Sequence, residues 1–221
     1  MAPSLRSERA LLSELDAGPT VDVIHDAISP DCEMALSPDG KRVVLGSHGS
    51  VRVWNLETGS TSHEEPADFD VVAIVIDGKS EQAVIGSRFG VLRVWDIAKG
   101  KTAHVLEGHA GTILDIVIST DGTRAITAAA DDTIRVWDLT AGRELVAHAG
   151  PLGKVDAVAV EPNGEFAFCV YGDTLIATRV ADFSRRGSIS LDHQITALAV
   201  APGGRRLALG DESGRVHFLR L

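Results

Sequence analysis

The sequence predicts an all-β protein built from five repeated, four-stranded antiparallel sheets, preceded by a short N-terminal helix. Three observations support this prediction. Tryptophan recurs in one register, with separations of 41 and 42 residues, at Trp54, Trp95 and Trp137. Glycine is abundant, with 22 residues in a chain of 221, and it is spread along the sequence. The segments between the glycines are short and rich in β-branched residues, which is typical of strands joined by tight turns.

The N-terminal segment, residues 1–19, lies outside the repeats. Residues 4–16 carry leucines at helical spacing, and the pair Gly18-Pro19 ends the pattern because neither residue continues a helix well. We interpret this segment either as a short packing helix or as the remnant of a linker to another domain. Residues 20–221 form the repeat region.

Each repeat contains turn markers besides its tryptophan. A turn-forming pair lies upstream in every unit, and these pairs are Asp39-Gly40, Asp77-Gly78, Asp121-Gly122, Asn163-Gly164 and Gly203-Gly204. Such pairs favour the positive φ angles of two-residue hairpin turns. A further glycine follows each tryptophan by five residues, at Gly59, Gly100 and Gly142. One unit therefore predicts four strands, with a tight turn after the first and another after the third.

The register continues beyond the last tryptophan. Thr178 and then Leu219 occupy the tryptophan position in units four and five. A four-stranded unit of this size cannot bury both faces alone, so we expect the units to pack face to face around an axis as a β-propeller. The last unit ends after its third strand, and residues 20–25 are expected to supply the fourth strand beside Val216. Three arrangements stay open: a closed five-bladed ring, an open arc of a larger array, and a ring completed by another chain.

The motifs RVWN, RVWD and RVWD, together with the single Gly108-His109 pair, resemble WD40 repeats, and the resemblance covers most of the chain. It implies a buried polar network in unit three, formed by His109, Thr127, Asp131 and Trp137. Unit two departs from the family pattern because Ile85 and Phe89 stand where the threonine and the aspartate are expected. Unit three alone matches the pattern at all four positions.

Charge and composition exclude several classes of protein. The chain has 31 acidic and 21 basic residues, a net charge of −10, which argues against nucleic acid as the main partner because phosphate binding needs a basic face. The longest apolar run, residues 71–76, is too short for a membrane span, and the N-terminus lacks the apolar core of a secretory signal. Cys32 and Cys169 lie in apolar segments, which predicts reduced, buried thiols in a cytoplasmic protein.

No motif in the sequence predicts catalysis. The sequence His63-Glu64 begins like a zinc-protease motif but lacks the second histidine, and neither cysteine belongs to a CxxC pair. A nucleophile elbow and a phosphate-binding glycine loop are also missing from the sequence. We therefore expect no enzyme activity, no metal site and no cofactor.

The resemblance implies a protein-interaction scaffold or sensing module that binds a peptide or protein on one rim of the propeller. The loops expected on that rim contain Phe69, Arg88, Phe89, Asp132, Tyr171, Asp211 and Glu212. Aromatic and arginine side chains are frequent interface anchors, and the negative net charge favours a basic or aromatic peptide. A partial propeller completed by another chain or domain is the second interpretation, and an enzyme is the third. The oligomeric state is left open.

Overall fold

The structure is a computed structural model, and it describes residues 32–47, 49–67, 69–149, 155–161, 164–201 and 204–220. Every regular element in these ranges is a β-strand. The helix predicted for residues 4–16 and the strand predicted for residues 20–25 lie outside the described residues. Within the described ranges, no helix is long and apolar enough to cross a membrane.

The strands form five antiparallel sheets, which we call blades 1 to 5. Within each blade, every strand pairs with the next one along the chain. Blade 1 consists of β1 (Glu33–Leu36), β2 (Arg42–Ser47), β3 (Ser50–Asn55) and β4 (Ser60–Pro66). Blade 2 consists of β5 (Val71–Ile76), β6 (Gln82–Ser87), β7 (Leu92–Asp96) and β8 (Lys101–Leu106). Blade 3 consists of β9 (Ile113–Ile118), β10 (Arg124–Ala129), β11 (Thr133–Asp138) and β12 (Arg143–Ala149).

Blade 4 consists of β13 (Ala157–Val160), β14 (Phe166–Tyr171), β15 (Thr174–Arg179) and β16 (Arg185–Ser190). Blade 5 consists of β17 (Ile195–Val200), β18 (Arg206–Asp211) and β19 (Val216–Arg220). The five repeated sheets predicted from the tryptophan register are therefore present. The fifth sheet has three strands among the described residues, in agreement with a last unit that ends after its third strand, and the fourth strand expected from residues 20–25 lies outside them.

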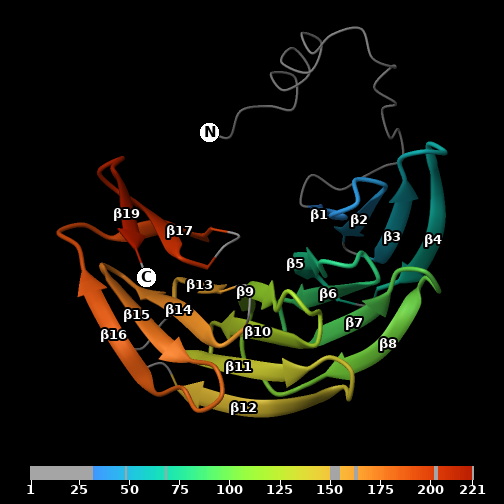
Figure 1. The fold of residues 1–221 in the computed structure, drawn as a ribbon. Helices are drawn as coiled ribbons and strands as arrows, with labels where there is room; N and C mark the ends of the chain where they lie inside the picture. The colour runs from blue at the N-terminus through green and yellow to red at the C-terminus, as the bar shows by residue number, and fades with distance from the viewer. Residues whose placement is uncertain are drawn as a thin grey trace, which may run out of the picture.

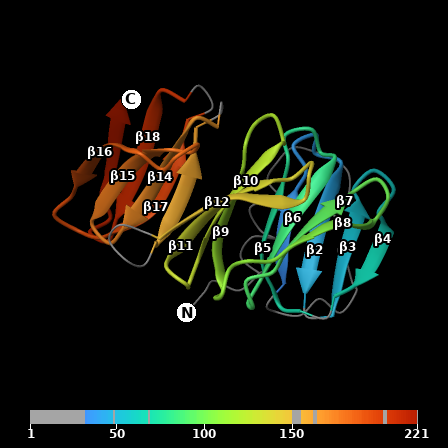
Figure 2. The ribbon, with the colours of Figure 1, turned by 90° about the horizontal axis from the view of Figure 1, so that it is seen from below.

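The blades follow one another around an open arc (Figure 1). The first strand of each blade lies on the inside of the arc, and β4, β8, β12 and β16 run along its outside. Seen from below, the blades keep the same order, with blade 3 between the two ends (Figure 2). Blades 1 and 5 lie apart at the two ends of the arc, so the described blades do not close into a ring.

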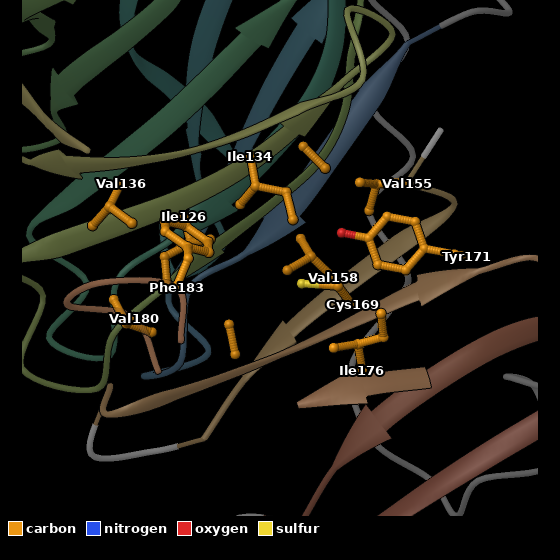
Figure 3. Packing of buried hydrophobic residues seen from close by; sticks show 12 residues of the cluster. Ile126, Ile134, Val136, Val155, Val158, Cys169, Tyr171, Ile176, Val180 and Phe183 are labelled. Carbon is orange, nitrogen blue, oxygen red and sulfur yellow. The ribbon is translucent and has the colours of Figure 1, made fainter. Parts of the chain in front are cut away.

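The core consists of the apolar side chains between neighbouring blades. Between blades 3 and 4, Ile126 and Val136 face Val158, Cys169 and the other labelled side chains of blade 4 (Figure 3). The tryptophans lie in the same kind of interface, because Trp95 packs towards blade 1 and Trp137 towards blade 2, each with 1% of its surface exposed. Full burial of an apolar side chain contributes about 1.5–3 kcal/mol, so this packing is the main source of stability.

The loop between the first two strands of a blade is longer than predicted. In blade 1, the Ser37 N–H donates to the carbonyl of Arg42 (2.8 Å) across four intervening residues, and Gly40 adopts a φ of 70°. The prediction of two-residue hairpins is therefore wrong, although the glycine does take the left-handed conformation. In blade 2, Ser80 (φ 59°) is the left-handed residue instead of Gly78, because the Asp-Gly pair begins this loop rather than occupying its middle.

The turns on the outside of the arc make a contact that recurs three times. A histidine on the outer strand of one blade meets the left-handed residue in the outer turn of the next blade, in the pairs His63–Gly100, His104–Gly142 and His148–Phe183. A Cβ atom added at Gly100 would lie 2.1 Å from the His63 ring, so this position needs glycine for space as well as for its φ of 63°. Phe183, with a φ of 52°, instead stacks on His148 with ring centroids 5.1 Å apart.

Candidate functional site

The four residues of the predicted polar network meet in blade 3. His109 lies in the loop before β9, Thr127 in β10, Asp131 in the loop after β10, and Trp137 in β11. His109 Nδ1 lies 3.0 Å from Asp131 Oδ2, and His109 Nε2 lies 2.7 Å from Thr127 Oγ1. The indole N–H of Trp137 donates to Thr127 Oγ1 at 2.9 Å. A single chain of hydrogen bonds therefore links the carboxylate to the indole.

The partners of His109 indicate its protonation. Burial is the main cause that lowers the pKa of His109, and it outweighs the opposite effect of the Asp131 carboxylate, so the ring is neutral at pH 7. A neutral ring beside a carboxylate carries its proton on Nδ1, which donates to Asp131. Thr127 then donates its hydroxyl proton to Nε2 and accepts the hydrogen bond from Trp137. Every member of the network has a partner in this assignment.

Asp131 also holds the surrounding backbone. Its carboxylate accepts hydrogen bonds from the Ala110 N–H (2.8 Å) and from the Thr133 N–H (3.0 Å) and hydroxyl (2.7 Å). Burial opposes ionisation, but the bonds from Thr133, Ala110 and His109 prevail and lower the pKa of Asp131 to about 2. The network thus ties the loop before β9 to the loop after β10. Because the His109 side chain is fully buried, we assign the network a structural role.

Blade 2 has the same tryptophan without the network. Ile85 occupies the place of Thr127, and its side chain is 1% exposed. Trp95 is as buried as Trp137, but its Nε1 has no hydrogen-bond partner among the described residues. A buried donor without a partner costs roughly 1–3 kcal/mol, and the surrounding apolar packing offsets that cost.

The structure separates the seven predicted rim residues into two groups. Arg88, Phe89, Asp132 and Glu212 are exposed, in loops between the second and third strands of blades 2, 3 and 5. Phe69, Tyr171 and Asp211 are buried, so the prediction that these three line the rim is wrong. The position of a residue in a loop or at a strand end did not predict whether its side chain faces the solvent or the core.

Each buried residue has a structural contact that explains its position. The guanidinium of Arg93 lies over the Phe69 ring, 4.4 Å from its centroid. Tyr171 ends β14 and belongs to the core between blades 3 and 4, where burial raises the pKa of its hydroxyl (Figure 3). Asp211 caps its own turn by accepting from the Arg215 N–H (3.0 Å), and it lies 2.7 Å from His217 Nε2. The hydrogen bond with His217 is the main cause that lowers the pKa of Asp211.

Phe89 is a large apolar residue on this rim that is 70% exposed. It lies in the turn between β6 and β7, which we call the rim turn and define as residues 87–91. Its neighbour Arg88 forms an ion pair with Asp70 (3.5 Å), and its backbone carbonyl accepts a hydrogen bond from the Thr112 hydroxyl (2.9 Å). Asp70 and Thr112 were not predicted from the sequence, because no local pattern signals a contact between separate loops.

The described residues contain no group of three or more histidine, cysteine, aspartate or glutamate side chains placed to hold a metal ion. The arrangement instead offers a rigid polar network inside blade 3 and an exposed aromatic side chain beside it.

Comparisons with known proteins agree with the repeat register. The sequence model of the "WD domain, G-beta repeat" family matches residues 25–55 and 100–138. A comparison with curated proteins finds no match. A chain in the crystal structure of a mitotic checkpoint complex has the same fold, with a TM-score of 0.76 and 16% sequence identity. The alignment covers 87% of the present chain but only 64% of the other, so the present chain spans less than two thirds of its length.

Three kinds of agreement support the resemblance to WD40 repeats. The tryptophan register places five blades where the structure has five sheets, and blade 3 contains the histidine, threonine, aspartate and tryptophan of the repeat in hydrogen-bond contact. The family match falls on the tryptophan-bearing segments of blades 1 and 3. The chain therefore contains WD40-type repeat sequence in these segments and shares the fold of the matched structure.

Proposed function

We propose that the chain is a protein-interaction module that binds a basic peptide or protein segment at the rim turn. The observation that carries this proposal is the 70% exposure of Phe89 in a turn whose flanking residues, Ser87 and Gly90, are buried. Solvent contact with a large aromatic ring is unfavourable, so its position is explained best by a partner that covers it. The general use of the WD40 fold as an interaction scaffold supports the same function.

The rim turn is rigid, which favours binding. The Ser87 N–H donates to the carbonyl of Val91 (3.0 Å), and the Gly90 N–H donates to the carbonyl of Ser87 (3.3 Å). The Arg88 N–H donates to the carbonyl of Asp70 (3.1 Å), so the loop before blade 2 holds the turn as well. A rigid aromatic anchor loses little conformational entropy on binding, and less of the interaction energy is spent on ordering it.

The charges of the neighbouring blades favour a basic partner. The loops between the second and third strands of blades 3, 4 and 5 each present an exposed carboxylate, at Asp132, Asp173 and Glu212. The whole chain has a net charge of −10, which adds a long-range attraction for cationic segments. A segment that combines an apolar side chain over Phe89 with lysine or arginine towards blades 3 to 5 fits this surface.

Selection from a randomised peptide display library on the immobilised chain tests the proposal. We expect the selected peptides to be rich in lysine and arginine. Phe89→Ala should weaken their binding roughly thirtyfold, the effect of an anchor worth about 2 kcal/mol. Leu145→Ala is the matched control, because Leu145 is an exposed apolar residue (37%) on β12, away from this rim.

Two results would contradict the proposal. Unchanged affinity of the selected peptides for Phe89→Ala would show that the rim turn is not the site. Selection of acidic peptides would exclude the basic partner, and increased affinity of those peptides for Asp132→Lys would point to an anionic ligand instead.

A further inference from the structure

Neighbouring blades pack through a socket formed by glycine. Gly46 lies in β2, and a Cβ atom added to it would lie 2.7 Å from Val71 Cγ1 and 2.8 Å from Ile74 Cδ1, both on β5 of blade 2. The second strand of one blade thus leaves a gap at the glycine, and the first strand of the next blade fills it with a branched side chain.

The contact repeats at the next interface. Gly86 holds the same position in β6, and an added Cβ atom would lie 2.8 Å from Ile116 Cδ1 and 2.9 Å from Ile113 Cγ2, both on β9 of blade 3. Ile74 and Ile116 occupy equivalent positions, because each is the third residue from the end of its strand. The socket and the isoleucine that fills it therefore recur at the first two interfaces between blades, whereas Ala128 and Val170 take the glycine position in blades 3 and 4.

Blade 5 has the same socket, and no side chain of another blade fills it among the described residues. Gly210 is the fifth residue of β18, as Gly46 is of β2 and Gly86 of β6. The only atoms of the described residues within 4 Å of an added Cβ belong to Ala197 and Thr196 of the same sheet.

The face of blade 5 around this socket is apolar and uncovered. Antiparallel pairing places Ala197, Ala199, Ala208, Gly210, Val216 and Phe218 on one face. Val216 is 60% exposed and Phe218 is 77% exposed, whereas Leu207 and Leu209 on the opposite face are buried against blade 4. We call this surface the socket face.

Blade 1 has the complementary surface. Met34 lies in β1 at the position of Ile74 and Ile116, the third residue from the end of the strand, and it is 61% exposed. Leu36, which is 60% exposed, and the half-buried Val43 and Trp54 share its face. We call these four residues the knob face.

The burial of the tryptophans indicates that no neighbouring blade covers the knob face within the described part of the chain. Trp95 and Trp137 are 1% exposed because the preceding blade covers each of them. Trp54 holds the same position in blade 1, but it is only half-buried. A surface that carries Met34 and Leu36 beside an incompletely covered tryptophan is typical of an interface rather than of a solvated sheet.

We propose that the chain self-associates head to tail, with the knob face of one copy packed on the socket face of another and Met34 seated at Gly210. The pairing continues the interface that already joins blades 1 to 2 and 2 to 3, so it needs no new packing geometry. Because the two surfaces differ, each copy offers one of each, and association builds a ring or an extending chain rather than a symmetric dimer. This surface is separate from the rim turn and does not depend on the function proposed for it.

The two faces of one copy do not meet in this structure. Blades 1 and 5 lie apart at the ends of the arc (Figure 1). Side-chain bonds between blades fix the curvature, including those from Thr102 Oγ1 to Glu65 (3.0 Å) and from Gln82 Nε2 to the carbonyl of Gly122 (2.5 Å). Contact between the two faces of one copy would require these interfaces to bend, whereas contact between faces of different copies does not.

The test uses two variants of the full chain, each blocked at one face. Gly210→Leu fills the socket, and Met34→Glu places a charge on the knob. Light scattering should show wild-type assemblies of at least two chains, and it should show single chains for each variant alone. An equal mixture of the two variants should form a dimer with one copy of each, because each still carries one intact face. Met34 and Gly210 lie at opposite ends of the arc, so each substitution leaves the other face intact. A misfolded variant would lose both faces and could not restore the complex.

Crosslinking identifies the contact within the dimer. In a background without Cys32 and Cys169, Met34→Cys and Gly210→Cys chains prepared separately and mixed under mild oxidation should give a covalent dimer. A single-chain mass for the wild type would overturn the proposal. So would a disulfide that forms only within a chain carrying both cysteines, because it would indicate closure of one copy on itself. Failure of the two blocked variants to associate with each other would overturn it as well.

Discussion

Blades 2 and 3 each bury a tryptophan at the same position of the repeat, but the indole N–H groups of the two tryptophans differ in their hydrogen bonding. In blade 3, Trp137 donates to Thr127 and is linked through His109 to Asp131. In blade 2, Trp95 is equally buried but lacks a hydrogen-bond partner among the described residues, and Ile85 fills the place of the threonine. Both blades nevertheless have four strands with the same antiparallel order.

The difference shows that the polar network is not needed to form a blade. Strand pairing, the outer turns and the apolar interfaces are common to both blades, so they are sufficient for the fold. The network adds a connection between two loops that blade 2 makes in another way, through the ion pair of Arg88 with Asp70 and the hydrogen bond from the Arg88 N–H to the Asp70 carbonyl. Loss of the network frees the loop position at Phe89 for a side chain that faces solvent.

The largest expected effect comes from removal of the Thr127 hydroxyl. Thr127→Val leaves His109 Nε2 and the Trp137 indole without their partner, and it should lower the free energy of unfolding by roughly 2–3 kcal/mol. Ile85→Val is the matched control at the same position of blade 2, and it should cost about 0.5–1.5 kcal/mol because it removes a methylene group alone. Urea denaturation measures both values. Equal losses would mean that the network contributes nothing to stability.

A smaller difference is expected between the two tryptophans. Trp137→Phe and Trp95→Phe remove the same volume, but the first also breaks a hydrogen bond whereas the second removes a donor that had none. Trp137→Phe should therefore be more destabilising by about 1 kcal/mol in the same denaturation assay. A larger loss for Trp95→Phe would show that Trp95 has a polar partner in solution.

The smallest expected effect is on pH dependence. The pKa of His109 in the folded chain is lower than its ordinary value of 6.5, so the unfolded chain binds this proton more readily. The stability that His109 contributes is complete above pH 6.5 and decreases as the pH falls below that value. Asp131 acts in the same direction at lower pH, because its pKa falls from 3.8 to about 2 on folding.

Thermal melts between pH 7.5 and 5 measure this dependence. His109→Asn should flatten the profile relative to the wild type, since asparagine does not titrate. His193→Asn provides the control, because that side chain is 41% exposed and lies outside the network. An unchanged slope for His109→Asn would place the titration elsewhere.

The sequence predicted the features that recur and missed those that depend on neighbouring blades. The spacing of Trp54, Trp95 and Trp137 identified the blades, because a repeat reports its own register. The positions of Phe69 and Tyr171 were misjudged because their burial depends on Arg93 and on the face of blade 3. Likewise, no local pattern links His63 to Gly100, whose contact arises only when two blades pack together.

The contacts of His63, His104 and His148 also have a geometric consequence. They lie on the outer strands, where the distance from the centre of the arc is greatest (Figure 1). Each pair of neighbouring blades can be pictured as a wedge whose tip points to the centre of the arc. A given change in the angle between the blades alters their spacing least at the tip and most at the outer edge. The outer contacts therefore act as spacers at the broad edge of each wedge. Glycine gives a thin spacer at blades 2 and 3 and Phe183 a thick one at blade 4, so this turn adds a contribution to the curvature besides that of the side-chain bonds between blades.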